Sequence, residues 1–370
     1  MIKIAVLPGD GIGREVTQAA LPVFKALDVP VNVIMGDIGW SYWQKEGNPI
    51  PQRTWRLIDQ VDAVLLGATT SKPYREAQEE LCPALKNQEE RDYLSPIIQL
   101  RQTLDLFANI RPCFNVRKED KPFNFCIIRE NTEGLYAGFD YHPLPPELKS
   151  LLQSNPKWQN SAEDEISCAL RLQSKKGLKR IYEFAFQYAK KHQMHRVTLA
   201  DKPNVLRASG AFAREQFEAV AKEFPSISAD ILNVDAVALG IIRRPESFGV
   251  IVAENMFGDI LSDVGAGVMG GLGFAPSANI GQKGCYFEPV HGSGPAMLSA
   301  QANPSAMFLT IGLLLNYFGY TEQAKKIRQA VSRVVNENQH VTYDLNGSST
   351  TAEMASAIIE KACDATYEPV

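Results

Sequence analysis

The sequence has few cysteines, no long apolar run and no excess of basic residues, and each shortage narrows the possible functions. Its six cysteines are spread over 370 residues and form no C-x-x-C or Cys–His zinc spacing, so reduced, mostly buried thiols are expected instead of a disulfide framework. The most apolar late stretch, AMFLTIGLLLNYFG, is shorter than the roughly 20 residues that cross a bilayer and predicts a buried helix. The formal net charge of −4 gives no support for binding to nucleic acid or to an anionic membrane. The chain also begins directly in a predicted strand, without the pattern of a signal peptide, so a cytoplasmic location is expected.

The chain opens with MIKIAVLPGDGIGREV, a strand-like run followed by a glycine-rich turn and a helical pattern. Gly9 and Gly11 match the first two glycines of the dinucleotide-binding G-x-G-x-x-G fingerprint. Gly13, however, comes one residue early, and Arg14 occupies the position of the third glycine. The fingerprint therefore fails, and another reason must explain three glycines and an aspartate in this turn.

Short runs rich in Val and Ile alternate with helical patterns along the chain, which predicts an α/β fold with parallel strands. In the first helical pattern, residues 16–27 keep apolar side chains at helical spacing. A length of 370 residues favours two domains, at about 150 residues each. The predicted strands are residues 2–8, 31–36, 63–68, 125–130, 196–201 and 249–255.

Two segments interrupt this alternation. Residues 71–94 are rich in charged side chains and predict a solvated helix or a lid. Residues 140–165 are rich in proline and then acidic, and a loop of this length is usually functional or an interaction arm. Because its apolar side chains would be out of place on a free loop, we expect the arm to pack on a partner subunit. These side chains are Tyr141, Leu144, Leu148, Leu151, Leu152 and Trp158.

The most distinctive local feature is NMFGDILSDVG, in which Asp259 and Asp263 are four residues apart. On a helix these carboxylates share one face and repel each other unless a cation separates them. Mg²⁺ typically binds through one or two carboxylates plus substrate oxygens. Acids near a helix N-terminus also occur without any metal, because they interact favourably with the helix dipole. On spacing alone, both interpretations stay open.

Three arginines lie beside predicted strands. Arg101 and Arg111 flank an apolar strand, and Arg129 lies at the end of another strand. An arginine at the end of a strand in an α/β sheet faces the usual ligand crevice, and guanidinium groups suit the recognition of carboxylates. For any one of these arginines alone, a surface ion pair is the simpler explanation.

Three further side chains could carry chemistry. Tyr136 could act as a general acid, and Lys202, just past a buried strand, could act as a base if burial lowers its pKa. His291 lies in EPVHGSGP, where the backbone could approach a ligand closely. Each has an ordinary alternative, namely packing for the tyrosine, a solvated strand end for the lysine and polar surface for the histidine.

Taken in order, ten motifs of the chain resemble those of one family, the β-decarboxylating dehydrogenases, which include isocitrate, homoisocitrate, isopropylmalate and tartrate dehydrogenases. The motifs are PGDGIGREV, GATT, LRQTLDLFANIRP, RENTEGLYAG, DKPNVL, VDAVAL, NMFGDILSD, GGLGFAPSANIG, EPVHGSGP and YDLNGSSTTAE. In this family the PGDGIG turn lies near the nicotinamide end of the cofactor, and the adenosine contacts the EPVHGSGP loop.

The resemblance implies the two-domain α/β fold of isocitrate and isopropylmalate dehydrogenases, with a discontinuous first domain, and not a Rossmann fold. Residues 1–110 plus 255–370 would form the large cofactor-binding domain. Residues 111–254 would form the small domain, with the dimer interface and an intersubunit clasp at about 140–165. The implied partner is a second copy of the chain, in a homodimer with shared active sites, and neither nucleic acid nor a membrane.

The resemblance also implies the reaction, a metal-dependent oxidative decarboxylation of a malate-type 2-hydroxy acid with NAD or NADP and with Mg²⁺ or Mn²⁺. Lys202, from the partner subunit, would be the base, and Tyr136 would donate a proton to the enolate. The implied metal ligands are Asp259, Asp263 and Asp235, the last from the partner subunit. The implied substrate-binding residues are Ser95, Ile97, Ile98, Arg101, Arg111, Arg129 and Asn204. The implied cofactor-binding residues are Thr69, Thr70, His291, Gly292, Ala296 and Asn303.

The segment YLSPIIQLR, which sets substrate choice in the family, combines two patterns. Ser95 matches the serine with which isocitrate enzymes bind the extra carboxylate. Ile97 and Ile98 resemble the leucine pair of isopropylmalate enzymes, but Leu94 replaces their glutamate. We therefore expect an isocitrate or homoisocitrate dehydrogenase, with 3-isopropylmalate, tartrate or malate as the alternative substrate.

The sequence leaves alternatives for the choice between NAD and NADP and for the class of function. Ala296 and Met297 stand where relatives carry their NAD- or NADP-selecting residues, and Gly347 replaces an arginine that would bind a 2′-phosphate, so NAD is expected. A non-catalytic regulatory subunit would share the fold but typically lacks the tyrosine, lysine or aspartates, all of which are present here. An unrelated protein that uses PGDGIG as an anion nest would leave the other nine motifs unexplained.

Overall fold

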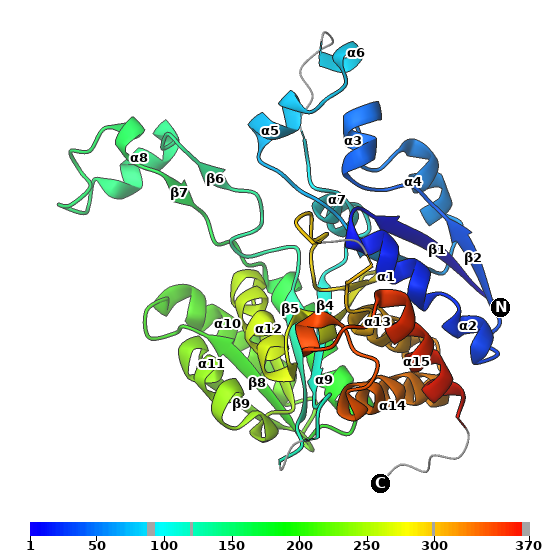
Figure 1. Cartoon of the computed structure of the whole chain (residues 1–370). Coiled ribbons are helices and arrows are strands. Elements are labelled where there is room, and N and C mark those ends of the chain that lie inside the picture. Colours follow the sequence, from blue (N-terminus) through cyan, green and yellow to red (C-terminus); the bar gives the residue numbers. More distant parts are fainter. Residues whose placement is uncertain (87–92, 119–120, 298–299, 365–370) are drawn as a thin grey trace.

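The computed structural model describes residues 1–86, 93–118, 121–297 and 300–364, and its centre is a mixed sheet of ten strands (Figure 1). The strand order is β2-β1-β3-β12-β11-β4-β5-β10-β8-β9. These strands are β1 (Ile2–Gly9), β2 (Val31–Met35), β3 (Ala63–Ala68), β4 (Ala108–Phe114), β5 (Asn124–Glu130), β8 (Arg196–Asp201), β9 (Ser228–Asn233), β10 (Val250–Ala253), β11 (Pro276–Ile280) and β12 (Cys285–Pro289). A separate pair is formed by β6 (Asp140–Tyr141) and β7 (Cys168–Ala169).

Helices cover both faces of this sheet. The α-helices are α1 (Ile12–Ala20), α2 (Val23–Ala26), α3 (Trp40–Glu46), α4 (Gln52–Ile58), α5 (Tyr74–Glu79), α6 (Pro83–Lys86), α7 (Pro96–Thr103), α8 (Pro146–Leu152), α9 (Lys175–Lys191), α10 (Arg207–Ala221), α11 (Val234–Arg243), α12 (Asn255–Met269), α13 (Ser305–Tyr317), α14 (Thr321–Glu337) and α15 (Thr351–Cys363). At β5, for example, α12 packs against Arg129 and Ile127, whereas Tyr188 of α9 lies beside Cys126 on the other face. Successive residues of a strand point to opposite faces, so the two helices sandwich β5.

All six predicted strands form, but the expectation of a parallel sheet is wrong at its middle. β2, β1 and β3 pair in parallel, and so do β5, β10, β8 and β9. β4 instead pairs antiparallel with β5 and β11, and β11 pairs antiparallel with β12. Only residues 115–123 join β4 to β5, which is too short for the helical crossover that a parallel pair needs.

The first helical pattern forms two helices, not one. α1 ends at Ala20 and α2 begins at Val23, with Pro22 between them, because proline cannot donate a helical hydrogen bond. The apolar stretch near residue 306 forms α13, which is buried on nearly every side, as predicted. No helix among the described residues is long and apolar enough to cross a membrane. The six cysteines are free thiols, and three of them are buried.

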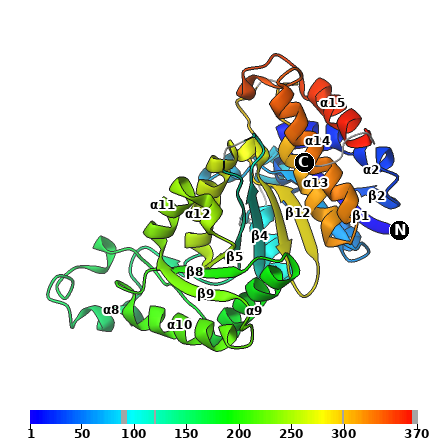
Figure 2. The ribbon, with the colours of Figure 1, turned by 90° about the horizontal axis from the view of Figure 1, so that it is seen from below.

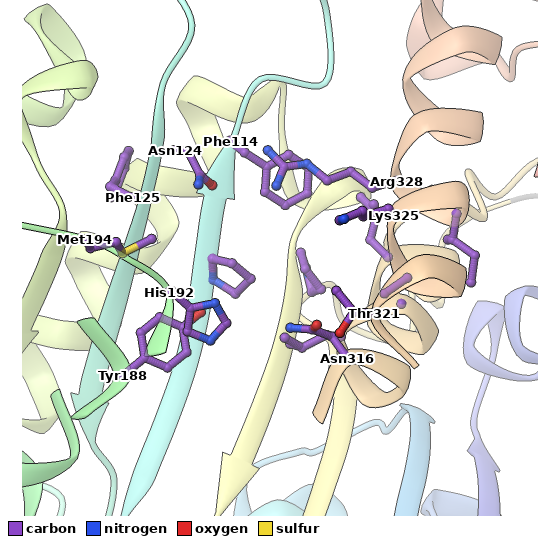
Figure 3. Close-up of a pocket in the computed structure, with 17 residues that line it drawn as sticks. Phe114, Asn124, Phe125, Tyr188, His192, Met194, Asn316, Thr321, Lys325 and Arg328 are labelled. Atoms are coloured by element: carbon purple, nitrogen blue, oxygen red, sulfur yellow. The ribbon is translucent and has the colours of Figure 1, made fainter. Parts of the chain in front are cut away.

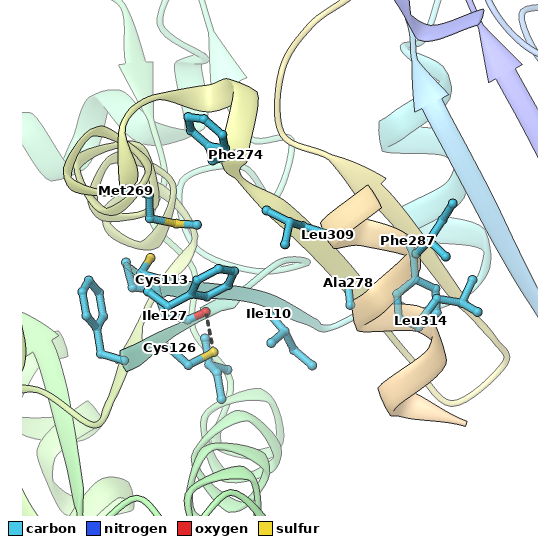
Figure 4. Close-up of a cluster of buried hydrophobic side chains, with 14 of the residues drawn as sticks. Ile110, Cys113, Cys126, Ile127, Met269, Phe274, Ala278, Phe287, Leu309 and Leu314 are labelled. Carbon is cyan, nitrogen blue, oxygen red and sulfur yellow. Dashed lines mark hydrogen bonds between the residues drawn. The ribbon is translucent and has the colours of Figure 1, made fainter. Parts of the chain in front are cut away.

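The middle of the sheet is the centre of the hydrophobic core. Ile110 of β4, Ala278 of β11 and Phe287 of β12 pack with Leu309 and Leu314 of α13 (Figure 4). The neighbouring residues of β4 and β12 therefore point to the opposite face of the sheet. That opposite face carries the polar residues of the candidate site.

Within the charged segment 71–94, residues 74–81 dock on α3. This part of the segment is therefore not the solvated helix that was expected. Ala77 and Leu81 are buried against Trp40 and Trp43. The Trp43 indole also donates a hydrogen bond to the Ala77 carbonyl, with 2.7 Å between nitrogen and oxygen. Residues 87–92 of this segment lie outside the described part of the chain.

The arm at 140–165 projects from one end of the molecule and carries α8, while β2 and α2 lie at the other end (Figures 1 and 2). Leu144 is buried within the arm, but Leu151 and Trp158 are exposed. Exposed apolar side chains on a projecting arm fit a contact with a partner subunit. That contact, and the domain boundaries at residues 110 and 255, stay predictions.

Candidate active site

The three glycines of the opening turn let its backbone pack directly against two distant segments. A Cβ atom on Gly9 would lie 2.0 Å from the carbonyl oxygen of Ala68, and one on Gly11 would lie 2.2 Å from that of Ser293. A Cβ atom on Gly13 would lie 2.3 Å from the Ala68 nitrogen. Gly9 and Gly11 also have φ values of 77° and 51°, which other residues rarely adopt. The turn thus brings β1, the end of β3 and the EPVHGSGP loop together.

Asp10 accounts for the aspartate in this turn. Its Oδ2 accepts hydrogen bonds from the backbone nitrogens of Trp40 at 2.8 Å and Thr70 at 3.0 Å. The Thr70 hydroxyl also hydrogen-bonds with the Ser293 hydroxyl at 2.7 Å. Thr69 and Thr70 therefore lie where the two motifs cross, which is where the resemblance predicts the cofactor.

Arg129, at the end of β5, is buried and held on two sides. Its side chain is 2% exposed, donates to Oδ1 of Asn255 at 2.9 and 2.7 Å, and forms an ion pair with Asp259. Burial, and then the nearby charge of Arg101, lower the pKa of Arg129 to about 10, so it stays cationic at neutral pH. α12 approaches β5 this closely because residue 258 is glycine. A Cβ atom on Gly258 would lie 2.7 Å from the Cβ of Arg129.

Arg111 points from β4 to the same face of the sheet. Its Nε donates to Oδ1 of Asn109 at 2.8 Å, and its Nη1 donates to the Ser262 hydroxyl at 3.2 Å. Asn109 in turn donates to Ser277 and Asn279 of β11, both at 2.8 Å. Burial lowers the pKa of Arg111. This polar chain fixes the direction of the guanidinium.

Arg101, on α7, is held by two residues of β12. Its Nε donates to the Tyr286 hydroxyl at 3.3 Å, and its Nη2 lies 3.8 Å from Oε1 of Glu288. Tyr286 and Asn279 both donate to that same Glu288 oxygen at 3.1 Å. Arg101 and Arg111 are therefore joined by one buried polar network that crosses three strands.

Asp259 lies at the centre of the site. One of its oxygens pairs with Arg129, and the other accepts a hydrogen bond from the Tyr136 hydroxyl at 3.2 Å. Asp263, one turn further along α12, lies 3.9 Å from Nη1 of Arg111. Burial, and then the Asp259 carboxylate, raise the pKa of Tyr136 above its ordinary value near 10.0. The phenol therefore keeps its proton at neutral pH.

The two acids of α12 fit a divalent cation. Burial raises the pKa of Asp263, and the neighbouring charge of Asp259 adds to this effect. Carboxylate pairs of this kind are oxygen ligands for Mg²⁺ or Mn²⁺, and a cation between them would remove their repulsion. The third predicted ligand, Asp235, is not beside them. Among the described residues, no group of three His, Cys, Asp or Glu side chains could hold a metal.

Lys202 and Asp235 form a second cluster, between the end of β8 and the start of α11. Their side chains form an ion pair, and this hydrogen bond lowers the pKa of Asp235. Asn204, two residues after Lys202, is exposed. In the described part of one chain, no hydrogen bond or ion pair joins this cluster to Tyr136 or to the three arginines. One chain therefore presents the predicted residues as two separate groups.

The residues predicted to choose the substrate lie at the start of α7. The Ser95 hydroxyl accepts a hydrogen bond from the Ser71 hydroxyl at 3.1 Å. Ile98 is 42% exposed, whereas Ile97 packs partly against the core beside Leu100. The start of α7 thus presents one hydroxyl and one apolar side chain.

The residues predicted to bind the adenosine part of the cofactor follow β12. Burial lowers the pKa of His291, whose Nδ1 lies 3.0 Å from the carbonyl oxygen of Gly292. The buried Nε2 of His291 has no hydrogen-bond partner in the described part of the chain, which fits a ligand atom at this position. Ala296 is exposed on the same loop, and the Asn303 amide donates to Asp344 at 2.9 Å.

The sequence analysis missed the residues that support the arginines. These are Asn109, Asn255, Ser262, Ser277, Asn279, Tyr286 and Glu288. A signal was present, because polar residues alternate with apolar ones in ANIRP, PSANI and CYFEP. Such alternation marks a strand with one polar face, although it does not say what that face holds.

Known proteins match the chain over nearly its full length. The family model for isocitrate/isopropylmalate dehydrogenase matches residues 3–358. Protein DlpA of Legionella pneumophila is 67% identical over 359 residues, which cover 97% of this chain and 58% of that protein. The 3-isopropylmalate dehydrogenase of Methanothermobacter thermautotrophicus is 38% identical over 362 residues, which cover 96% of this chain and 97% of that one. The structure of isocitrate dehydrogenase from Methylococcus capsulatus matches with a TM-score of 0.84 at 34% identity, covering 98% and 100% of the two chains.

By class, the fold is that of a decarboxylating dehydrogenase. The chain belongs to the isocitrate/isopropylmalate dehydrogenase family. This finding confirms the predicted fold class and excludes the alternative of an unrelated anion-binding protein. The chain spans about three fifths of the length of DlpA, but nearly the full length of the other two proteins.

Proposed function

We propose that this protein catalyses the oxidative decarboxylation of a malate-type 2-hydroxy acid with NAD and Mg²⁺ or Mn²⁺, and that its substrate is isocitrate or homoisocitrate. One observation carries the proposal. Arg101, Arg111 and Arg129 converge on one face of the sheet with Asp259 and Tyr136.

The three arginines suit a substrate with two or three carboxylates. Arg101 and Arg111 each lower the pKa of Arg129, and Arg101 lowers that of Arg111, so the guanidinium groups repel one another in the unliganded site. An anionic substrate would relieve this repulsion. Because each guanidinium is also fixed by neighbouring side chains, little side-chain entropy is lost when carboxylates bind.

The other groups suit the chemistry of decarboxylation. A divalent cation at Asp259 and Asp263 would serve as a Lewis acid toward the substrate oxygens when bound. Tyr136 keeps its proton and is aimed at Asp259, so it can deliver that proton to carbon after carbon dioxide has left. Lys202 of a second copy would accept the proton of the substrate hydroxyl.

A homodimer would complete the site. α11 and α12 pack on each other and expose Leu239, Ile242 and Ile260, which are 57%, 61% and 56% accessible. Large apolar side chains grouped on adjacent helices are typical of an interface. We propose that these helices meet those of a second copy, so that Lys202 and Asp235 of one chain reach the arginines and acids of the other.

The proposed cofactor is NAD and not NADP. A Cβ atom on Gly347 would lie 2.0 Å from the carbonyl oxygen of Val341, so this position has no room for a cationic side chain that could bind a 2′-phosphate. Ala296 brings no charge to the EPVHGSGP loop either. The Nε2 of His291, which has no partner among the described residues, would hydrogen-bond with the adenosine.

The start of α7 offers a contact to each of two candidate substrates. The Ser95 hydroxyl, beside that of Ser71, offers a polar contact to the extra carboxylate of isocitrate or homoisocitrate. The exposed Ile98 favours 3-isopropylmalate as the second candidate, because its side chain suits an apolar branch. The relatives leave this choice open, since one is named for isopropylmalate and another for isocitrate.

The test is cofactor reduction by the purified protein with Mn²⁺. The substrates are isocitrate, homoisocitrate, 3-isopropylmalate, malate and tartrate, each with NAD and with NADP. We expect turnover of a tricarboxylate with NAD that stops when the metal is chelated, and a higher KM for that substrate in Ser95→Ala. Preference for 3-isopropylmalate would overturn the assignment of the substrate. No turnover of any substrate would overturn the proposed activity and favour a regulatory subunit.

A further inference from the structure

On the face of the sheet opposite the active site, a groove runs between α9 and the α13–α14 pair (Figure 3). It consists of two adjoining cavities of about 260 and 180 Å³, which share Tyr188, His192, Leu313 and Asn316. Residues of β4, β5, β11 and β12 form its floor. None of the residues of the active site described above lines it.

The groove and the active site use alternate residues of the same strands. In β4, Arg111 belongs to the active site, whereas Pro112 and Phe114 line the groove. In β12, Glu288 belongs to the active site and Phe287 lines the groove. Because successive side chains of a strand point to opposite faces, the groove is a separate site on the reverse face of the sheet.

Aromatic rings and one guanidinium group form the walls (Figure 3). On the α9 side, Tyr188 and His192 stack with their ring centroids 4.1 Å apart. On the α14 side, the guanidinium carbon of Arg328 lies 3.7 Å from the centroid of the Phe114 ring. Leu313 of α13 completes the apolar lining between them. The groove is therefore mainly apolar, with the Arg328 guanidinium at its Phe114 end and Lys191 in the smaller cavity.

Arg328 has no anionic partner among the described residues. In the described part of the chain, no hydrogen bond or ion pair holds its guanidinium, which stacks on Phe114. Burial lowers the pKa of Arg328 to about 10, so the group is still charged at neutral pH. Lys325, one turn away, instead pairs with Glu322. No aspartate or glutamate is among the described residues that line either cavity.

We propose that this groove binds an amphipathic organic anion, with a carboxylate on Arg328 and an aromatic or branched aliphatic body along Phe114 and Leu313. Charge complementarity selects the anion, because Arg328 and Lys191 line the groove and no acidic residue is among its described lining residues. A guanidinium stacked on an aromatic ring still presents its N–H groups in its own plane, where a carboxylate accepts them. The apolar floor selects the hydrophobic body.

The probe for this proposal is 2-naphthoate, and neutral 2-naphthamide is its matched control. Binding to the full chain is measured by ligand-observed NMR titration. Arg328→Met removes the cation, and Leu313→Trp fills the groove without changing a charge. Lys326→Met is the matched control, because it removes an exposed charge from the same helix outside the groove.

We expect 2-naphthoate to bind wild type and Lys326→Met equally. It should bind Arg328→Met at least about tenfold more weakly, since a hydrogen bond to a charged group contributes about this much to affinity. It should bind Leu313→Trp at least about tenfold more weakly as well, because the indole occupies the space of the ligand's apolar body. Wild type should also bind 2-naphthamide at least about tenfold more weakly than 2-naphthoate. Unchanged binding in both groove variants would show that the anion binds elsewhere, and equal affinity for the amide would refute recognition of the charge. The absence of any binding at millimolar 2-naphthoate would refute the site itself.

Discussion

Gly258 provides a direct test of how the site holds Arg129. It lies where α12 crosses β5, and its missing side chain leaves room for the arginine. A Cβ atom at this position would lie 2.7 Å from the Cβ, 2.8 Å from the Cγ and 3.1 Å from the Cα of Arg129. Ordinary carbon–carbon contacts are about 3.5–4.0 Å, so Gly258→Ala must push α12 and β5 apart by about 1 Å.

Two consequences follow from this displacement. Overpacking of a buried contact typically lowers the free energy of unfolding by about 1–3 kcal/mol. The Arg129 guanidinium would also shift relative to Asn255 and Asp259, its partners on α12. A misplacement of about 1 Å in an active site can cost about a hundredfold in rate. We therefore expect Gly258→Ala to remain folded, with kcat/KM lower by about 10–100-fold.

The assays are urea unfolding and steady-state kinetics, with Gly267→Ala as the matched control in the same helix. A Cβ atom on Gly267 would meet no atom within 4 Å. Alanine there should leave the kinetics unchanged and raise the free energy of unfolding by about 0.5–1 kcal/mol, through helix propensity. If Gly258→Ala changes neither stability nor kinetics, or if Gly267→Ala is equally harmful, the packing argument is refuted.

Two further predictions concern single titratable groups. Tyr136→Phe should lower kcat by about 10²–10⁴-fold. It should leave the free energy of unfolding unchanged, because the Tyr136 hydroxyl bonds only to Asp259 among the described residues. A kcat within a factor of about two of wild type would contradict the role of Tyr136 as the proton donor. Burial lowers the pKa of His291 below its ordinary 6.5, so below that pH the unfolded chain binds a proton that the folded chain does not. The free energy of unfolding should therefore fall as the pH drops below about 6.5, and less steeply in His291→Gln than in wild type or the exposed-site control His340→Gln. Equal slopes in urea titrations from about pH 5 to 7 would show that His291 is not responsible.

Local patterns predicted some of the candidate site from the sequence. The spacing of Asp259 and Asp263 placed both on one helix face, and the run before Arg129 placed it at a strand end. Both conclusions depend only on neighbours in the sequence, which is why they could be drawn without the fold. The break between α1 and α2 also depends on a local feature, Pro22. It was missed because the helical spacing of apolar residues continues past this proline.

Long-range pairing could not be predicted in the same way. Alternating strands and helices indicated a parallel sheet, but the antiparallel β4, β5 and β11 bring Asn109 beside Asn279. The antiparallel pairing of β4 with β11 joins Arg111 to Glu288 through the buried side chains of Asn109 and Asn279. Lys202 was assigned to the site through the resemblance to the family, and not through its spacing from the other site residues. Within one chain, no described hydrogen bond or ion pair joins it to Tyr136.

The central claim is that each active site combines Tyr136 of one copy with Lys202 of the other. Tyr136→Phe and Lys202→Met should each be nearly inactive. Unfolding and refolding them together in equal amounts should make about half of the dimers mixed, and each mixed dimer has one site with both substitutions and one with neither. We predict that activity rises to about one quarter of the wild-type value. Activity that stays at the level of the separate variants would contradict the shared site.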